Sequence, residues 1–108
     1  MGNVAELNDA NFSSEVVDAS TPVLVDFWAT WCGPCRKLSP VIEEISEQYQ
    51  DKVKFVKINV QDNTQTAQTY SVSGLPCILL FKDGQPVERM AGMFPKSKII
   101  SNIEKHIG

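Results

Sequence analysis

The chain has 108 residues, a length that predicts one domain over residues 1–108. Its 10 basic and 13 acidic side chains give a net charge of -3 without any basic run, so we expect no nucleic-acid-binding surface. No apolar run reaches the roughly 18 residues that a membrane span needs, and residues 1–12 lack the basic start and apolar core of a signal peptide, so neither is expected.

The first half of the chain predicts two strands and two helices. A short strand is expected at residues 4–7, and apolar residues at helical spacing predict a helix over 9–19. Residues 23–29 are nearly all apolar, with β-branched and aromatic side chains, which is typical of a central strand covered on both faces. Apolar residues then recur at three and four, which predicts a helix over 32–50.

The second half adds three strands and two helices. We expect a buried strand at 53–60, a short helix at 63–70 and another apolar strand at 77–81. An Asp-Gly pair then signals a tight hairpin to a strand at 86–90. Pro95 suits the first position of a last helix with an apolar stripe. The order β-α-β-α-β-α-β-β-α predicts an α/β fold, in which helices cover a mixed sheet whose final hairpin is antiparallel.

Cysteine usage points to a reducing compartment. The chain has three cysteines, Cys32, Cys35 and Cys77, an odd number and too few for a disulfide-stapled secreted scaffold. We therefore expect a cytoplasmic protein, or one of an organellar matrix or stroma if a leader has been removed. In such a compartment, closely spaced cysteines usually indicate redox chemistry or a metal site.

Cys32 and Cys35 have the spacing of a reversible dithiol–disulfide couple. Cys32 falls at the predicted strand-to-helix junction, and Cys35 follows within the Cα distance that a disulfide needs. The N-terminus of a helix carries partial positive charge and free N–H groups, which stabilise a thiolate at Cys32. Pro34 suits this first turn because it has no N–H to lose. Cys32 is therefore predicted to attack a target disulfide, and Cys35 to resolve the mixed disulfide.

A zinc site is the alternative interpretation of this spacing. Zinc needs four protein ligands in a structural site, and the remaining candidates are Cys77 and His106. His106 follows a lysine at the end of the last predicted helix and is expected to be solvated. We therefore expect no metal.

Asp26 stands where a buried strand normally has a hydrophobic residue. Burial without a partner disfavours a charge, so the pKa of Asp26 should be raised. Such a group can accept the proton of the resolving thiol, whereas the structural alternative is a hydrogen-bonding or surface-facing Asp. Lys57, in the next strand, either faces Asp26 and tunes it or is an ordinary solvated lysine.

At the cysteine pair the sequence resembles the thioredoxin family. The family's active-site signature, WCGPC, is present here as residues 31–35. Further matches follow in the family's order over essentially the whole chain: VDFWA before the signature, Pro40, KINV at 57–60, GLP at 74–76, LLFKDG at 79–84 and Gly92. The resemblance implies the thioredoxin fold, a central mixed sheet flanked by four helices.

The resemblance also implies an activity. It implies a general protein disulfide reductase and electron carrier, with Cys32 as nucleophile, Cys35 as resolving thiol and Asp26 as buried acid–base group beside Lys57. No cofactor is implied, because the cysteine pair is the redox centre. The implied partners are disulfide-containing target proteins and a reductase, either an NADPH-linked flavoprotein or a ferredoxin-linked enzyme. The protein itself is expected to be a monomer.

The resemblance further implies a flat apolar surface that accepts an extended target chain. It implies that Pro76 is a cis-proline packed against the disulfide. Trp31 directly precedes the thiols outside the apolar run, which argues against a place in the core. The surface is implied to consist of Trp31, Gly33, Pro34, Gly74, Leu75, Pro76, Gly92 and Met93.

The chain departs from the family's usual pattern at several positions. Cys77 stands where Thr is usual, and is either a small buried thiol or a third redox thiol. The segment 93–95 is bulkier than usual, which puts substrate preference in question. Gln61 replaces Asp, a change expected to loosen the setting of Trp28, and Arg36 replaces a common Lys with the charge kept.

Two rival functions follow from the same residues. One is an oxidase or isomerase with the same chemistry, although the Gly-Pro dipeptide between the cysteines is the family's mark of a reductant. The other is a binding module in which the thiols are incidental. Intact Cys32, Cys35 and Asp26 count against the binding module.

Overall fold

The computed structural model describes residues 3–107, so residues 1, 2 and 108 of the expected domain lie outside the described residues. Strands and helices alternate in the predicted order, which confirms the α/β class and, within 3–107, the expected four helices. The elements are β1 Val4–Leu7, the π-helical segment η1 Ser13–Val17, β2 Val23–Trp28, α1 Gly33–Tyr49, β3 Lys54–Asn59, α2 Thr64–Thr69, β4 Cys77–Lys82, β5 Gln85–Ala91 and α3 Lys96–Ile107.

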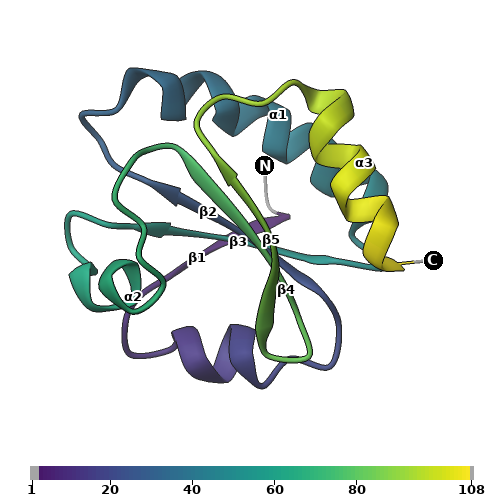
Figure 1. The fold of residues 1–108 in the computed structure, drawn as a ribbon, viewed down its shortest axis with the longest axis horizontal. Coiled ribbons are helices and arrows are strands. Elements are labelled where there is room, and N and C mark those ends of the chain that lie inside the picture. Colours follow the sequence, from purple (N-terminus) through teal and green to yellow (C-terminus); the bar gives the residue numbers. More distant parts are fainter. Residues whose placement is uncertain (1–2, 108) are drawn as a thin grey trace.

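The strands form one mixed sheet with β2 at its centre. Their order is β1-β3-β2-β4-β5. β1, β3 and β2 run parallel, whereas β4 runs antiparallel to β2 and β5 antiparallel to β4 (Figure 1). Every residue of β2 from Val23 to Phe27 is buried, as the nearly continuous apolar run predicts for a strand covered on both faces.

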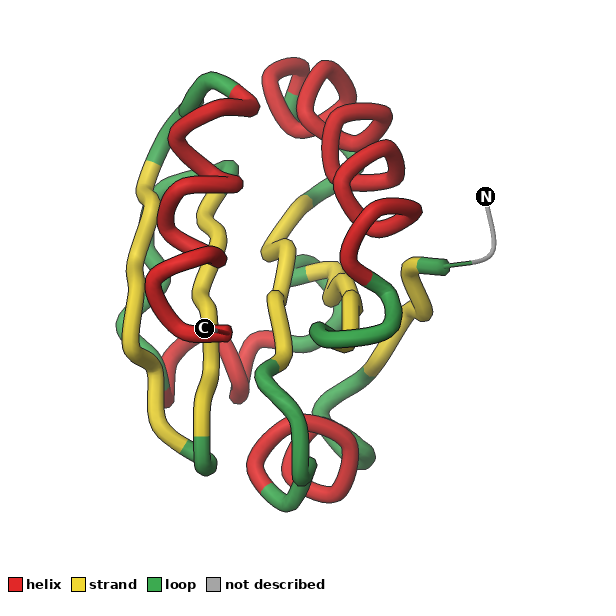
Figure 2. The backbone as a smooth tube through the Cα atoms, turned by 90° about the vertical axis from the view of Figure 1, so that its right-hand side faces the viewer, coloured by secondary structure: helices red, strands yellow, loops and turns green. Residues whose placement is uncertain are grey.

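Helices cover the two faces of the sheet and enclose two cores. Figures 1 and 2 show α1 and α3 on one side of the strands, and η1 and α2 on the other. The core under α1 and α3 joins apolar residues of both helices, such as Leu38 and Ile99, to Leu24 of β2. The opposite core joins Phe12 and Val16 to Phe27. The alternation of side chains along β2 therefore sends Asp26 to the same face as Leu24, under α1.

The helix expected over residues 9–19 is much shorter than predicted. Only η1 and the residue before it are helical in this stretch. The side chains of Asn8 and Asn11 instead accept hydrogen bonds from each other's backbone N–H groups, at 3.0 and 2.8 Å, and hold a local turn that competes with a helix. Asp9 is engaged elsewhere, because its carboxylate accepts hydrogen bonds from Thr66 at the start of α2.

Three loops meet at the end of the sheet where β2 leads into α1. The turn after β2 carries the first cysteine, and the loop before β4 contributes Leu75, which packs against the cysteine pair. The loop from β5 to α3 joins them, because Gly92 N–H donates to the Pro76 carbonyl at 2.8 Å. Gly92 has a φ of +98°, a backbone conformation that glycine adopts readily and other residues rarely.

Candidate active site

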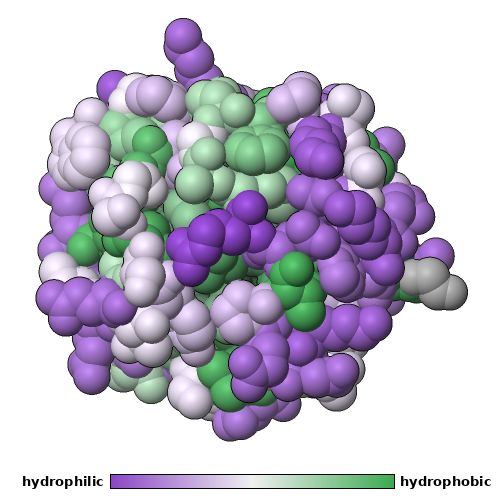
Figure 3. Space-filling view, in the orientation of Figure 1, coloured by the Kyte–Doolittle hydropathy of each residue, from purple (hydrophilic) through white to green (hydrophobic). Residues whose placement is uncertain are grey.

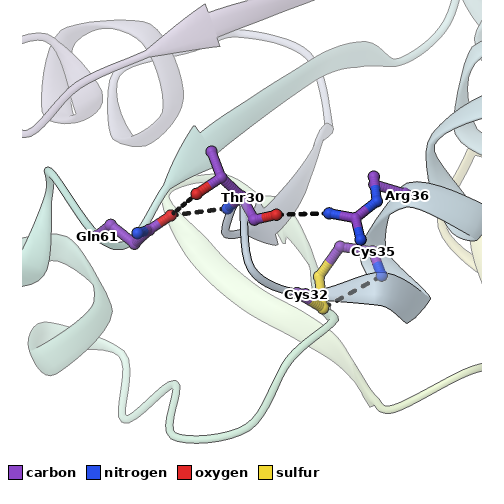
Figure 4. Close-up of a disulfide and its surroundings, with 5 residues drawn as sticks. All are labelled: Thr30, Cys32, Cys35, Arg36 and Gln61. Atoms are coloured by element: carbon purple, nitrogen blue, oxygen red, sulfur yellow. Dashed lines mark hydrogen bonds between the residues drawn. A yellow bond between two sulfur atoms is a disulfide. The ribbon is translucent and has the colours of Figure 1, made fainter.

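The two cysteines of the signature lie at the N-terminus of α1. Cys32 is the N-cap residue, and its sulfur accepts a hydrogen bond from the Cys35 N–H at 3.2 Å (Figure 4). The two residues form a disulfide, with Cα atoms 5.3 Å apart. Gly33 and Pro34 make the first turn, where Pro34 leaves no buried N–H without a partner. The helix N-terminus therefore faces Cys32 with N–H groups and partial positive charge.

Both cysteines are almost covered by protein. Each is 3% exposed, and their neighbours are Ala29, Trp28 and Leu75. Such low exposure keeps bulk water away from the sulfurs, which strengthens the electrostatic effect of nearby dipoles and charges.

Asp26 is buried in the central strand, as the sequence predicts. It is 4% exposed, and its Oδ1 has no hydrogen-bond partner among residues 3–107. Burial raises the pKa of Asp26 from its ordinary 3.8 to about 7, against the opposing effect of the positive charge of Lys57. The carboxyl group can therefore change its protonation state close to neutral pH.

Lys57 lies beside Asp26 because the two residues are in register. β2 and β3 are parallel neighbours, and Asp26 pairs with Lys57 across them. The Lys57 ammonium lies 5.6 Å from the centre of the Trp28 ring, at the distance of a cation–π contact. These contacts distinguish Lys57 from a strand lysine whose side chain is simply surrounded by solvent.

A small cavity connects the buried acid with the second cysteine. It has a volume of about 110 Å³, and its lining includes Asp26, Cys35 and Lys57 together with Trp28, Arg36 and Ser39. A space of this size exceeds the roughly 10–15 Å³ that one water molecule needs. Ser39 was not predicted to belong to the site. The signal that could have indicated it is its position four residues after Cys35, which places both residues on one face of α1.

The residues predicted to contact a target lie in the first turn of α1 and in the loops after β2, before β4 and after β5. Trp31 is 67% exposed and Met93 is 52% exposed. Gly74 and Leu75 precede Pro76, and the Leu75–Pro76 peptide bond is cis, as the resemblance implied. Figure 3 shows less polar surface gathered over the upper end of β5 and the loop to α3, the loop that carries Gly92 and Met93.

Cys77 lies apart from the cysteine pair in the protein's interior. It is 1% exposed, belongs to the core on the η1 side of the sheet, and is a free thiol. Its burial raises the pKa of the thiol, while the Arg89 guanidinium 3.9 Å from its sulfur acts in the opposite direction. These observations agree with the interpretation of Cys77 as a small buried thiol.

Gln61 directs its side chain to Thr30 rather than to Trp28. Its Oε1 accepts hydrogen bonds from Thr30 N–H and Oγ1, at 2.7 and 2.6 Å (Figure 4). The indole Nε1 of Trp28 is buried and has no hydrogen-bond partner among residues 3–107. Gln61 therefore does not accept a hydrogen bond from the Trp28 indole, and the loosening of Trp28 stays a prediction.

The zinc alternative gains no support. No group of three or more potential ligands that can hold a metal ion is found within the part of the chain that the structure describes. The expectation that His106 is solvated is wrong, because its side chain is half-buried and its Nε2 lies 2.8 Å from a carboxylate oxygen of Glu88. None of the helices within residues 3–107 is long and apolar enough to cross a membrane.

A disulfide-forming cysteine pair at a helix N-terminus, on this α/β sheet, defines a thiol–disulfide oxidoreductase. The family model named Thioredoxin matches residues 3–105. Thioredoxin 1 of Synechococcus elongatus is 46% identical over 107 residues, which cover 99% of this chain and 100% of the relative. Thioredoxin 1 of Nostoc sp. is 45% identical, and thioredoxin of Haemophilus influenzae 44% identical, with the same coverage. The chain belongs to the thioredoxin family.

Proposed function

We propose that the protein reduces disulfide bonds of other proteins and carries the electrons on the Cys32–Cys35 pair. One observation carries the proposal: the cavity that joins Cys35 to the buried, raised-pKa carboxyl of Asp26. A disulfide with a purely structural role would not need a proton acceptor beside Cys35. A pair that changes reversibly between dithiol and disulfide does need a proton acceptor at this position, and Asp26 can provide it.

In the first step the Cys32 thiolate attacks one sulfur of the target disulfide. The Cys35 N–H and the positive end of α1 stabilise the thiolate before the attack. A bond forms between Cys32 and the attacked sulfur, and the target's own disulfide bond breaks. The second target sulfur leaves with the electron pair as a thiolate and takes up a proton from water.

In the second step Cys35 resolves the mixed disulfide. The Asp26 carboxylate accepts the Cys35 proton through the cavity, and the resulting thiolate attacks the Cys32 sulfur. The bond between Cys32 and the target breaks, so that the target leaves with both sulfurs reduced and the Cys32–Cys35 disulfide is formed. Lys57 favours the ionised form of Asp26 and so keeps the acceptor available at neutral pH.

The proposed target surface surrounds Cys32. Trp31 and Met93 are exposed, and Leu75 brings the loop before β4 against the cysteine pair, which supports this proposal. An extended target segment can lie across this surface and add to the exposed backbone beside Leu75. Gly33, Pro34, Gly74 and Gly92 complete the surface in this proposal.

The family implies disulfide-containing targets and a partner reductase that recharges the oxidised protein. We propose that the reductase is either an NADPH-linked flavoprotein or a ferredoxin-linked enzyme. We further propose a monomer of one domain over residues 1–108, working in the cytoplasm or in an organellar matrix or stroma. The redox centre needs no bound cofactor or metal, because the sulfurs themselves hold the electron pair.

Serine variants of the cysteines test the scheme. Cys32→Ser should abolish reduction of insulin disulfides by dithiothreitol, whereas Cys35→Ser should trap a mixed disulfide with the target. Cys77→Ala is the matched control and should keep the activity. A Cys32→Ser protein that still reduces insulin would refute the proposal.

The reduction potential of the cysteine pair separates a reductant from an oxidase or isomerase. The known reference values are about -270 mV for thioredoxin and about -180 mV for protein disulfide isomerase. We expect equilibration with glutathione to give a value nearer the first. A value near the second would favour an oxidising or isomerising role.

A further inference from the structure

Thr30, in the turn between β2 and α1, is held at all three of its polar groups. Gln61 Oε1 accepts hydrogen bonds from its N–H and its hydroxyl, at 2.7 and 2.6 Å. Arg36 Nη1 donates to its carbonyl at 2.5 Å. Figure 4 shows Gln61 and Arg36 reaching Thr30 from opposite sides. We call these three residues the Thr30 clamp.

The clamp is anchored to the two elements beside the turn. Arg36 belongs to the first turns of α1. Gln61 follows β3, where its own N–H donates to Asn59 Oδ1 at 2.8 Å. The residue before it, Val60, donates its N–H to the Trp28 carbonyl at 2.9 Å. The position of Thr30 is therefore set relative to both the sheet and the helix.

In the sequence, Trp31 lies between Thr30 of the clamp and Cys32. On its other side, Cys32 is fixed as the N-cap of α1, and its N–H donates to the Ala29 carbonyl at 3.2 Å. Trp31 itself is 67% exposed, so little protein packs against its ring. The backbone that Thr30 and Cys32 hold on either side therefore sets the direction in which the Trp31 side chain leaves the main chain.

We propose that Gln61 and Arg36 are positioning residues that act through Thr30 to preorganise Trp31 for binding an extended protein target. The inference rests on the proposed reductase function and deepens it by naming residues that position part of the target surface. A residue whose backbone is already held in place loses less conformational freedom when its side chain binds a target. A small disulfide, which meets only the sulfurs, gains little from this preorganisation.

All three residues of the clamp are exposed. Water can therefore satisfy their polar groups when one partner is removed, so the variants avoid the larger cost of a buried unsatisfied group and should still fold. The loss of the clamp's hydrogen bonds should then be detected in the interaction with the target. Cys32 keeps its place in the variants, because its disulfide, N-cap position and bond to Ala29 do not involve the clamp.

Gln61→Met tests the inference, since it keeps the side-chain length and removes the acceptor of two hydrogen bonds. We expect KM for a protein disulfide such as insulin to rise about threefold to tenfold, as the loss of about one net hydrogen bond implies. The kcat value should change less than KM. The rate constant with a small aromatic disulfide should change less than KM does, and the reduction potential should stay the same.

Conservative and control variants separate positioning from a merely structural role. Gln61→Glu keeps an acceptor oxygen and should restore KM toward the wild-type value. Thr30→Val removes only the hydroxyl bond and should raise KM less, which also provides the test if Gln61→Met does not fold. Gln68→Met and Gln68→Glu make the same changes on the exposed face of α2 and should leave KM unchanged.

Several results would overturn the inference. One is a Gln61→Met protein whose KM for insulin is that of the wild type. Another is a Gln61→Met protein whose rate constant with the small disulfide falls by the same factor by which KM for insulin rises. A Gln61→Glu protein as impaired as Gln61→Met would also contradict it. A wild-type protein that reduces neither substrate would overturn the proposed function itself, and the inference with it.

Discussion

Replacing Asp26 with asparagine should stabilise the folded protein, by an amount that increases with pH. The folded protein keeps the Asp26 proton up to about pH 7, whereas an unfolded chain releases it near the ordinary pKa of 3.8. Between these values the folded state binds more protons, so stability falls as the pH rises. Below this window Asp26 is protonated in both states, so it takes no stability from the folded protein. Above the window Asp26 is ionised in both states, so the loss of stability reaches its full value and no longer changes with pH.

The magnitude follows from the size of the pKa difference. Each pKa unit corresponds to about 1.36 kcal/mol, so a rise from 3.8 to about 7 makes the ionised carboxylate cost the folded protein roughly 4 kcal/mol. That is a large share of the roughly 5–15 kcal/mol by which domains are stable. Asparagine has nearly the same shape and no charge, so the pH-dependent part of the cost disappears.

Urea denaturation of the oxidised proteins at pH 5 and pH 8.5 measures the effect. The stability advantage of Asp26→Asn over the wild type should grow by roughly 2 to 3 kcal/mol between these pH values. Asp62→Asn, which neutralises an exposed carboxylate, is the control and should show no such growth. An advantage of Asp26→Asn that is equal at both pH values, or smaller at pH 8.5, would refute the reasoning.

Three further predictions concern Lys57, Cys77 and Asp9. Lys57→Met removes the charge that lowers the pKa of Asp26, so the fall in stability should extend above pH 7 in the same urea series; an unmoved midpoint would contradict this. Cys77, the one free thiol of residues 3–107 in the oxidised protein, should react with a thiol reagent only after unfolding in urea, and fast reaction in the native state would contradict its burial. Asp9→Ala removes the acceptor of the hydrogen bonds from Thr66 at the start of α2 and should lower the free energy of unfolding by about 1 kcal/mol; an unchanged urea midpoint would show that these bonds contribute nothing.

Local patterns predicted the elements that carry the cysteine pair. The buried run before the signature and the change to helical spacing after it lie within one stretch of sequence. The predicted helix over 32–50 therefore differs by only one residue at each end from α1, Gly33–Tyr49. The prediction over 9–19 failed for two reasons. Asn8 and Asn11 hold a turn that competes with the helix, and the partner of Asp9 is Thr66, 57 residues away, a contact that no periodicity within the segment indicates.

The site was predictable where one residue breaks a strong pattern. Asp26 is the single charged residue in an otherwise apolar strand, so its burial and raised pKa follow from position alone. Its pairing with Lys57 was an open alternative until the register of β2 and β3 was known. The contact between Thr30 and Gln61 had no signal at all, because both are exposed polar residues 31 positions apart that take part in no periodic pattern.

Two buried titratable groups in this protein show what separates a reactive site from an inert one. Asp26 and Cys77 are both nearly inaccessible, and burial raises the pKa of each. Cys77 packs into the core on the η1 side of the sheet. Asp26 instead lines a cavity that also reaches Cys35 and Lys57. Because a proton can move only where there is a path and an acceptor, the cavity, rather than the raised pKa, is the reason for our proposal that Asp26 exchanges a proton with the cysteine pair.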